Sequence, residues 1–399
     1  MRITTNMMYD RSVNSLMNTT ERLNKASTQL DTGERFTTAS EDPAAMAQKL
    51  NLTTAISRYQ QYNTNGGLLQ SSLALEETTL DSLYTSMSSA YSKVQQAING
   101  TNDSTDLDTL ASELEQLQSQ MLDLMNTKDA SGQYIFSGNQ TQTPAVGLDG
   151  NGQYQFQGDS GQRFTQVSAT VQIAANDSGA SLFQNVALPR SATASTGTAA
   201  VSSQGQFDSF YRSNYDPATP ANNVYSVTTV AGSPDQYEIR NAGGTLLQSG
   251  DYTQNEDITF NGLTLNPGVA AGSSSTFSLD APGSDNVLNT LSDMISALRD
   301  GSVSTEQLKS LAAKTEGHLT NTQTSINTTL GRIGGRLNNL DTIMTSNDEL
   351  KTLSKTAKAN VSEIDLYEAA TNVTQETNAL SMAQQAYSMI SKTTLFDYI

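Results

Sequence analysis

Apolar residues recur at alternating steps of four and three along much of this 399-residue chain. Such spacing puts them on one side of an α-helix, which must bury that side against another helix. The stripe is most regular from residue 69 onward. Its members are Leu69, Leu73, Glu76, Leu80, Leu83, Met87, Ala90, Val94 and Ala97, followed after a polar turn by Leu107, Leu110, Leu114, Leu117, Met121 and Leu124. We predict an antiparallel helical hairpin over residues 69–97 and 107–124.

Both chain ends carry weaker stripes of the same kind. The N-terminal stripe is Tyr9, Val13, Leu16, Thr20, Leu23, Ser27 and Leu30; the C-terminal stripe is Leu366, Val373, Leu380 and Tyr387, with Ala369, Ala383 and Ile390 beside it. Because Thr20, Ser27 and Glu376 interrupt these stripes, each helix would be marginal alone. We predict that the two ends return to each other. We also predict an assembly interface with other subunits, formed by Val13, Leu16, Leu23, Leu30, Leu366, Val373, Leu380, Tyr387 and Ile390.

Glycine and proline predict where the first helices begin and end. Gly33 fits the end of a first helix, and Asp42 followed by Pro43 fits the start of a second. Gly66 and Gly67 predict an interruption or a bend in that second helix.

The composition changes between residues 137 and 284 to Gly, Asn, Ser and Thr. Short alternating runs at 154–156, 224–227 and 258–260 predict strands, and Asp149–Gly152 predicts a hairpin turn. The stretch of about residues 190–206 is rich in Ser, Thr and Ala, which predicts a flexible linker. Helix is expected again from about Asp285, with apolar positions Leu291, Ile295, Leu298, Leu308, Leu311, Leu319, Ile326, Ile333, Leu337, Leu340 and Met344.

The predicted fold class is α+β: a long helical bundle or coiled coil formed by both chain ends, with an inserted β-rich domain. We expect residues 1–40 and 356–399 to form a terminal-helix domain. The helical bundle domain would comprise residues 41–136 and 285–355, and the β-rich outer domain residues 137–284.

Composition excludes several classes of function. The net charge of −18 disfavours binding to nucleic acid or to an anionic membrane surface. The sequence contains no run of 18 or more apolar residues, so no membrane span is predicted. The N-terminus lacks the apolar stretch of a secretory signal. Cysteine is absent and His318 is the single histidine, so thiolate chemistry and multi-histidine metal sites cannot form within one chain.

The remaining candidates for chemistry favour structural explanations. His318 lacks a recognisable catalytic partner in the sequence. Asp149, Asn151 and Gln153 have the spacing of a calcium loop, but Tyr154 and Ser160 stand where that loop needs glycine and glutamate. The carboxylate pairs Glu76–Glu77 and Glu256–Asp257 are typical of solvated surfaces. We therefore predict no enzyme, no cofactor and no metal site; an enzyme carried by the insert would need a pocket with convergent polar groups.

The stretch LDTGERFTTASEDPAAMAQKL, residues 30–50, resembles a segment of the bacterial flagellin-like axial proteins. The opening MRITTNMMY, the segment Gly132–Gly138 and the ending Leu395–Ile399 resemble the hook-associated members rather than the filament subunit. Asp257–Gly262 resembles a recurrent strand and turn of the group. The matched terminal segments cover roughly half of the chain.

The resemblance implies a structural, extracellular protein of the flagellum at the junction of hook and filament, on which flagellin assembles. It implies type III export without a cleavable signal, aided by a cytosolic chaperone, and self-assembly into a ring between another hook-associated protein and flagellin. The terminal helices would form an inner tube and the β insert would face outward. Alternatives are filament flagellin or an adhesive variant of it, and a chemoreceptor-like coiled coil, which would need a membrane span.

Overall fold

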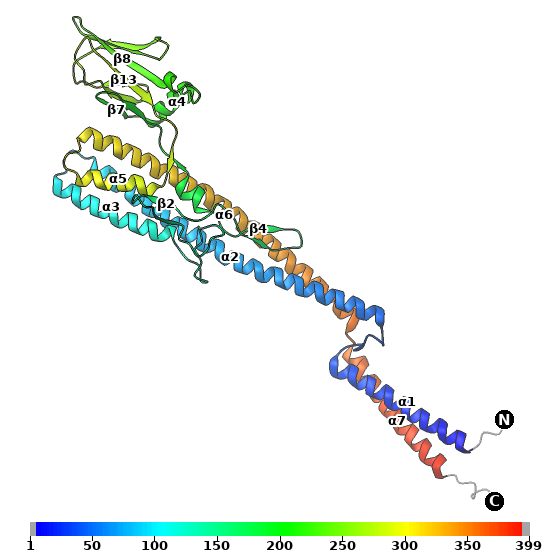
Figure 1. Ribbon diagram of the computed structural model, residues 1–399. Helices are drawn as coiled ribbons and strands as arrows, with labels where there is room; N and C mark the ends of the chain where they lie inside the picture. Colours follow the sequence, from blue (N-terminus) through cyan, green and yellow to red (C-terminus); the bar gives the residue numbers. More distant parts are fainter. Residues whose placement is uncertain (1–4, 393–399) are drawn as a thin grey trace, which may run out of the picture. The chain divides into compact units, whose positions relative to one another are not determined.

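Long helices dominate both halves of the chain, with a β-rich segment between them, in the computed structural model (Figure 1). The structure describes residues 5–392, so the predictions for residues 1–4 and 395–399 lie outside the described residues. The predicted α+β class is confirmed. The helices are α1 (Thr5–Thr32), α2 (Pro43–Ala97), α3 (Ser104–Met125), α4 (Gln204–Asn214), α5 (Val287–Arg299), α6 (Thr305–Ser362) and α7 (Leu366–Lys392), with short π and 3₁₀ turns η1 (Ala180–Gln184) and η2 (Pro220–Asn223).

The chain forms two compact units. The first comprises Met1–Gly66, Gln166–Val171 and Asp341–Ile399, and the second comprises Gly67–Thr165 and Gln172–Leu340. The first unit therefore contains α1, α7 and the adjoining parts of α2 and α6. The second contains the bundle of α2, α3, α5 and α6 together with the β-rich insert. No helix within residues 5–392 is long and apolar enough to cross a bilayer.

The stripe predicted on α2 is buried throughout. All nine residues from Leu69 to Ala97 are at most 2% exposed, including Glu76. A tight polar turn then leads into α3, where the Asp103 side chain accepts hydrogen bonds from the backbone N–H groups of Thr105 and Asp106, and the Asp106 carboxylate accepts one from the N–H of Asp103. This reciprocal capping fixes the start of α3. The predicted helical hairpin is confirmed.

Helix α2 starts where the sequence predicted. The Asp42 carboxylate accepts a hydrogen bond from the Ala45 N–H at 2.9 Å, and Pro43 is the first helical residue. The predicted interruption at Gly66 and Gly67 is wrong, because α2 continues through both residues. A glycine costs a helix about 1 kcal/mol relative to alanine, and burial of Leu69 and Leu73 immediately afterwards offsets that cost.

Helix α6 buries aliphatic and threonine side chains alternately. Leu319, Ile326 and Ile333 are fully buried at the predicted positions. Between them, at strict intervals of seven, Thr315, Thr322 and Thr329 are also fully buried. The hydroxyls of Thr315 and Thr322 donate to the carbonyls four residues earlier, at 2.8 Å, so no polar group of theirs is left unpaired in the core.

The β-rich insert is built mainly from a five-stranded and a three-stranded antiparallel sheet. The first has the order β10-β9-β8-β13-β6 and the second β11-β12-β7. Their bounds are β6 (Ala192–Ala194), β7 (Thr198–Val201), β8 (Val224–Val230), β9 (Gln236–Arg240), β10 (Leu246–Asp251), β11 (Ile258–Phe260), β12 (Leu263–Asn266) and β13 (Ser274–Leu279). Both sheets and α4 enclose one aromatic core, in which Phe207, Phe260 and Phe277 are buried.

The predicted strands 224–227 and 258–260 are present, but the flexible linker predicted at 190–206 is not. That segment holds β6, β7 and the first turn of α4. Its small side chains pack against the aromatic core, with Ala192 buried and Ala194, Ala199 and Val201 half-buried. Gly197, between the two strands, has φ +74°, and a side chain there would collide with the carbonyl of Asn266.

Within the described part of the chain, three smaller antiparallel strand pairs lie outside the two sheets. The predicted turn at 149–152 joins β1 (Val146–Leu148) to β2 (Tyr154–Phe156). Strands β3 (Phe164–Gln166) and β4 (Gln172–Ala174) form another hairpin. Within the first unit, the tip of this hairpin buries Val167 and is held by side-chain amides of Asn65 and Asn347, which donate to the carbonyls of Gln166 and Val167. The pair β5 (Val186–Ala187) and β14 (Ser284–Asp285) leads into and out of the two sheets.

One carboxylate is buried in the α2 stripe beside an ion pair. Glu76 is 1% exposed and accepts a hydrogen bond from the Asp177 N–H at 3.0 Å. The Asp177 carboxylate binds both terminal nitrogens of Arg336 on α6, at 2.8 and 2.9 Å. Burial, with a smaller contribution from the negative charge of Asp177, raises the pKa of Glu76 to about 8. Glu76 is therefore protonated at neutral pH.

The raised pKa predicts a pH-dependent stability. The Glu76 carboxyl binds its proton more tightly in the folded state (pKa about 8) than in the unfolded state (pKa 4.5). Proton binding therefore stabilises the folded state fully below about pH 4.5, and this stabilisation is lost as the pH rises through about 8. Glu76→Gln should reduce the fall in unfolding free energy between pH 5 and pH 9, as measured by urea denaturation. Glu77→Gln is the control, and an unchanged pH slope in Glu76→Gln would contradict the assignment.

The α2 core allows a matched test. Leu83→Ala removes a fully buried side chain and should cost about 2–5 kcal/mol of unfolding free energy. Leu68→Ala removes the same atoms from a side chain that is 68% exposed on the same helix, and should cost less than about 1 kcal/mol. Equal losses in thermal or chemical denaturation would show that the stripe is not the core.

Candidate assembly interface

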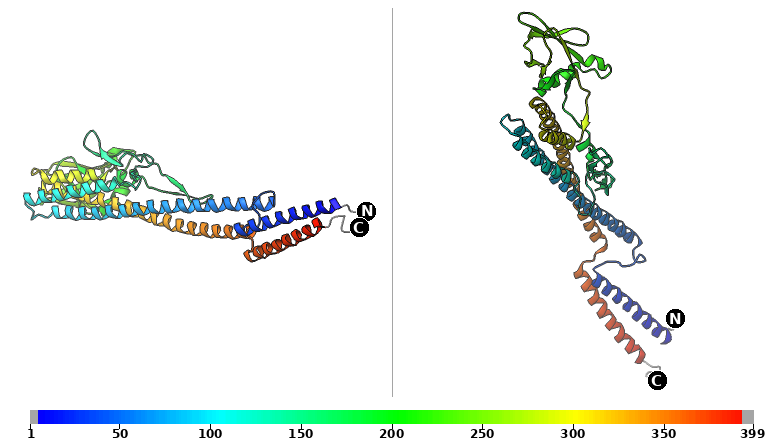
Figure 2. Two further views of the ribbon diagram at one scale, coloured as in Figure 1. Left: turned by 90° about the horizontal axis from the view of Figure 1, so that it is seen from below. Right: turned by 60° about the vertical axis from the view of Figure 1, so that its left-hand side comes forward.

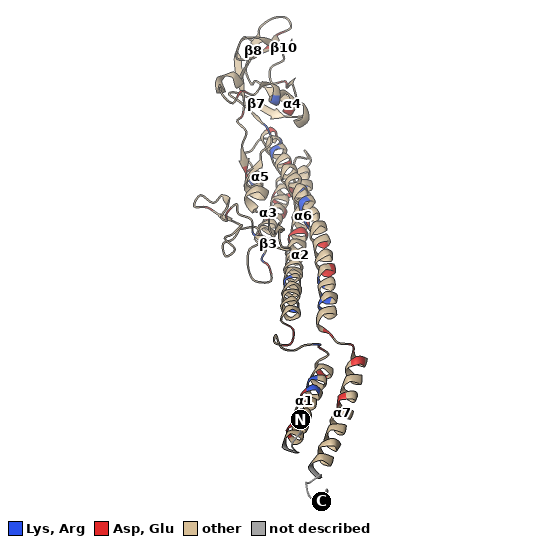
Figure 3. Ribbon diagram, turned by 90° about the vertical axis from the view of Figure 1, so that its right-hand side faces the viewer, with Lys and Arg blue, Asp and Glu red and all other residues tan. Residues whose placement is uncertain are grey.

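The two chain ends pair as antiparallel helices (Figures 1 and 2). Two contacts show that the helices run in opposite directions: Tyr9 contacts Tyr387, and Arg22 contacts Glu376. Neither helix has a continuous hydrophobic face, and Figure 3 shows that most of each ribbon is uncharged, with a few isolated acidic and basic positions. The pair therefore rests on a narrow seam and a few specific contacts.

Eight of the nine predicted interface residues are half-buried in this pair: Val13, Leu16, Leu23, Leu30, Val373, Leu380, Tyr387 and Ile390. The ninth, Leu366, is 60% exposed at the start of α7. The seam itself differs from the prediction by one position at two points. Thr19 and Ala26 are buried where Thr20 and Ser27 were expected, and the Thr19 hydroxyl donates to the Ser15 carbonyl at 2.8 Å.

Two polar contacts lock the register of α1 against α7. The hydroxyls of Tyr9 and Tyr387 share a hydrogen bond of 2.7 Å, with ring centroids 5.4 Å apart. This hydrogen bond raises the pKa of Tyr387. Between three and four helical turns closer to the α1–α2 connection, Arg22 Nε lies 3.1 Å from both carboxylate oxygens of Glu376. The residue that interrupts the C-terminal stripe thus has a partner on the other chain end.

A shallow groove of about 550 Å³ lies along α1 where the seam is incompletely covered. Val13, Leu16 and Met17 supply its apolar wall, Thr20, Glu21 and Asn24 its polar one, and Tyr387 closes one side. Met17 is 65% exposed. The groove is therefore lined by three of the predicted interface residues, Val13, Leu16 and Tyr387, and is open to solvent in a single copy.

Further large apolar residues are exposed in the first unit. On α7 these include Tyr367 (84% exposed) and Met382 (69%), and on the adjoining parts of α2 and α6 they include Leu50 and Leu353, each 66% exposed. Heptad spacing does not identify these residues, because it marks only the side of a helix that faces its partner. They could have been found in the sequence as large apolar residues that lie on the predicted helices but outside the heptad stripe.

The residues considered for chemistry have structural roles. The Asp149 carboxylate accepts hydrogen bonds from the N–H groups of Asn151 and Gln153 at 2.8 and 2.9 Å, and these bonds lower its pKa. His318 is fully buried, and its Nδ1 shares a hydrogen bond of 2.6 Å with the Thr290 hydroxyl. Burial lowers the pKa of His318 to about 4. Within residues 5–392, no group of three or more His, Cys, Asp or Glu side chains could hold a metal ion.

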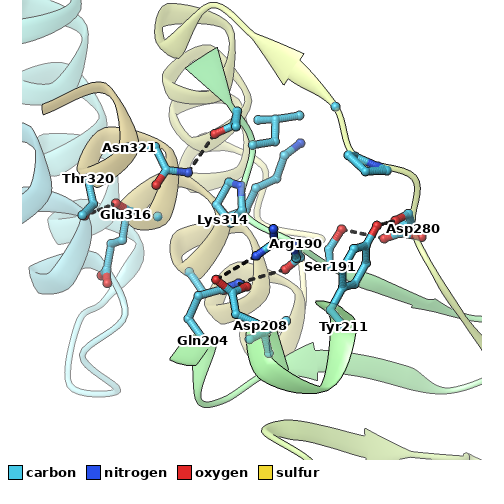
Figure 4. A pocket seen from close by; sticks show the side chains of 18 of the residues that line it. Arg190, Ser191, Gln204, Asp208, Tyr211, Asp280, Lys314, Glu316, Thr320 and Asn321 are labelled. Atoms are coloured by element: carbon cyan, nitrogen blue, oxygen red, sulfur yellow. Dashed lines mark hydrogen bonds and ion pairs between the residues drawn. The ribbon is translucent and has the colours of Figure 1, made fainter. Parts of the chain in front are cut away.

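A cleft of about 860 Å³ lies in the second unit at the base of the insert (Figure 4). Arg190 pairs with Asp208 at 3.1 Å, Ser191 donates to Asp280 at 2.6 Å, and Asn321 on α6 donates to the Ala187 carbonyl at 2.8 Å. These side chains hold the entering and leaving strands of the insert to each other and to α6. Each of these three interactions joins two parts of the fold.

The N-terminal region of the chain is similar to known flagellar proteins. The family model of the bacterial flagellin N-terminal helical region matches residues 3–141. Flagellar hook-associated protein 3 of Escherichia coli (strain K12) is 34% identical over 143 residues, which are 36% of this chain and 45% of that protein. The match thus spans less than half the length of this curated relative.

Two solved structures resemble the chain over most of its length. One is flagellar hook associated protein-3 from Legionella pneumophila, with 25% identity and a TM-score of 0.62, covering 78% of this chain and 98% of that one. Another is described as the flagellar junction protein FlgL from the same organism, with 26% identity and a TM-score of 0.59, covering 79% and 99%. The resemblance expected from the sequence is confirmed: residues 3–141 match the model of the bacterial flagellin N-terminal helical region, and the similar proteins are named as hook-associated or junction proteins of the flagellum.

Proposed function

We propose that this chain is a structural subunit of the bacterial flagellum that forms the junction between hook and filament and supports the assembly of flagellin. The observation that carries the proposal is the pairing of the two chain ends into a helix pair with solvent-exposed apolar residues, such as Tyr367 and Met382. A monomer gains nothing from exposing these side chains, whereas neighbouring copies could bury them. The names of the similar proteins, hook-associated protein and junction protein, support the same role.

The interface we propose consists of the nine predicted residues together with the exposed residues of the first unit. Val13 and Leu16 lie in the groove on α1, while Leu366 lies exposed on α7. Because these positions belong to different surfaces, one copy would offer a groove to a different surface of the next copy. Such heterologous contacts generate rings or helical assemblies rather than closed dimers.

The proposed partners are copies of the same chain in a ring, a second hook-associated protein on the hook side and flagellin on the filament side. We further propose export through the flagellar type III apparatus with a cytosolic chaperone, and an extracellular location. The proposed division assigns 1–40 and 356–399 to the terminal-helix domain, 41–136 and 285–355 to the bundle, and 137–284 to the outer domain. A role as filament flagellin or an adhesive variant has less support, since the curated relatives are named hook-associated protein 3.

A deletion strain tests the role directly. Cells lacking this chain should release flagellin into the medium and lack attached filaments, and immunogold labelling of complemented cells should mark only the boundary between hook and filament. Label along the whole filament would instead identify a filament subunit. Absence of flagellar label would reject the flagellar role.

A single substitution tests the interface. Leu366→Glu places a charge on an exposed apolar position of α7, so we expect an unchanged circular dichroism spectrum and a loss of motility of at least about tenfold in the complemented deletion strain. The control is Val230→Glu, which charges a comparably exposed apolar side chain (47%) on β8 of the insert. Normal motility with Leu366→Glu would remove this residue from the interface.

A further inference from the structure

Asparagine is followed directly by glycine at four places in the chain: Asn65–Gly66, Asn99–Gly100, Asn151–Gly152 and Asn261–Gly262. In such a pair the backbone nitrogen of the glycine can attack the side-chain carbonyl carbon of the asparagine, since glycine has no side chain to block the approach. The attack needs a glycine N–H that is free of other partners and a backbone that can rotate. The fold therefore decides which of the four pairs reacts.

The first pair is protected by helix α2. Gly66 lies inside this helix and is buried, so its N–H belongs to the helical hydrogen-bond ladder. The side chain of Asn65 is also engaged: its nitrogen donates to the Gln166 carbonyl at 3.0 Å, and its oxygen accepts from Gln61 at 2.9 Å. Neither the attacking nitrogen nor the attacked amide is free at this pair.

The pair at residues 151–152 is fixed by the hairpin turn between β1 and β2. Gly152 N–H donates to the Asp149 carbonyl at 3.1 Å, so the attacking nitrogen already has a partner. The Asp149 carboxylate accepts a hydrogen bond from Asn151 N–H at 2.8 Å, which holds the backbone on the other side of the asparagine. Both residues of the pair are exposed, so their protection comes from hydrogen bonds and not from burial.

The pair at residues 261–262 forms the two-residue turn between β11 and β12. Asn261 has φ +46° and Gly262 φ +83°, as a tight hairpin requires. The Gly262 carbonyl accepts hydrogen bonds from the N–H groups of Ser202 and Ser203 at 2.8 and 3.0 Å, and Gly262 is buried. The backbone cannot rotate here without breaking these bonds.

The pair at residues 99–100 lies in the turn between α2 and α3, where both residues are exposed. Asn102 N–H closes this turn by donating to the Asn99 carbonyl at 3.2 Å, which leaves the N–H of Gly100 unused. Within residues 5–392, neither that N–H nor the Asn99 side chain has a hydrogen-bond partner. A Cβ atom on residue 100 would meet nothing within 4 Å, so the space around the reacting atoms is open.

We propose that Asn99 is a site of self-modification: in the folded chain Asn99 deamidates, while the other three pairs are protected. A bond forms between the Gly100 nitrogen and Asn99 Cγ, the bond from Cγ to Nδ2 breaks, and Nδ2 leaves as ammonia with the amide proton of Gly100. Water then opens the five-membered imide, giving its hydroxyl to a carbonyl carbon and its proton to the Gly100 nitrogen. Opening at Cγ yields aspartate, and opening at the backbone carbonyl carbon yields isoaspartate.

Either product changes the turn of the helical hairpin. The new negative charge lies two residues beyond Ala97, the last residue of α2, and negative charge is unfavourable at a helix C-terminus. The side chain of Asn102 caps this helix end by donating to the carbonyls of Gln96 and Ala97 at 2.7 and 3.3 Å. Isoaspartate lengthens the main chain between Ala97 and this cap by one carbon atom. These consequences do not depend on the proposed flagellar role.

Mass spectrometry of the full chain tests the ranking after incubation at mildly alkaline pH and proteolytic digestion. The peptide that contains Asn99 should gain aspartyl and isoaspartyl forms at least about fivefold faster than the peptides with the other three pairs, the factor that one protecting hydrogen bond supplies. In guanidinium chloride, where the fold protects none of the pairs, the four rates should converge. Circular dichroism during incubation verifies that the chain is folded in the first experiment.

Two variants separate the chemistry from the fold. Gly100→Ala fits the open turn but hinders the approach of the backbone nitrogen, so deamidation of Asn99 should slow severalfold. Asp149→Ala removes the carboxylate that fixes the turn between β1 and β2. Deamidation of Asn151 should then accelerate about fivefold or more, because two hydrogen bonds are lost, while the rate at Asn99 stays unchanged.

Three results would overturn the assignment. The first is deamidation of another asparagine of the four pairs as fast as that of Asn99 in the folded chain. The second is the same ranking in guanidinium chloride, which would show that neighbouring residues and not the fold set the rates. The third is an unchanged rate in Gly100→Ala, because the Gly100 nitrogen would then not be the attacking group. Since motility plays no part in these measurements, failure here and failure of the flagellar role are distinguishable.

Discussion

Burial of one apolar stripe on α2 is the constraint on which the second unit depends. Each residue of that stripe from Leu69 to Ala97 is removed from solvent, and α3, α5 and α6 supply the surfaces that cover it. A helix of this composition would not persist in water by propensity alone. Once it is buried, the hairpins and strands that connect the helices acquire fixed ends, and the two sheets of the insert can form on a rigid base.

The stripes on α2 and α3 were predictable because their residues are apolar and regularly spaced. The buried threonines of α6 were not, because Thr315 and Thr322 become compatible with a core only when their hydroxyls bond the preceding turn, and Thr329 only when its hydroxyl accepts a hydrogen bond from Arg332. In α1 the choice between Thr19 and Thr20 depends on the direction from which α7 approaches, which no single-helix pattern specifies. The strands of residues 192–201 were missed since small residues predict flexibility unless a large aromatic core lies beside them.

The candidate interface was predictable to a similar extent and for similar reasons. Spacing identified most of the residues that α1 and α7 present to each other, because the contact between two helices is periodic. It could not identify Met17, Tyr367 or Met382, whose significance lies in the absence of any covering side chain within one copy. A polar interruption such as Glu376 also has no sequence signature of pairing, since its partner Arg22 lies at the opposite end of the chain.

The part of the insert that holds the two sheets, residues 188–283, begins and ends at adjacent points, because β5 and β14 pair with each other and Leu188 N–H donates to the Gly283 carbonyl at 2.9 Å. The two ends of a module attached in this way are paired with each other where they join the rest of the chain. Its length and internal fold can therefore change without altering the distance between β5, which precedes it, and β14, which leads into α5. In evolutionary terms, the sheets are free to diverge or to be exchanged, while the helices on either side of them must be kept together.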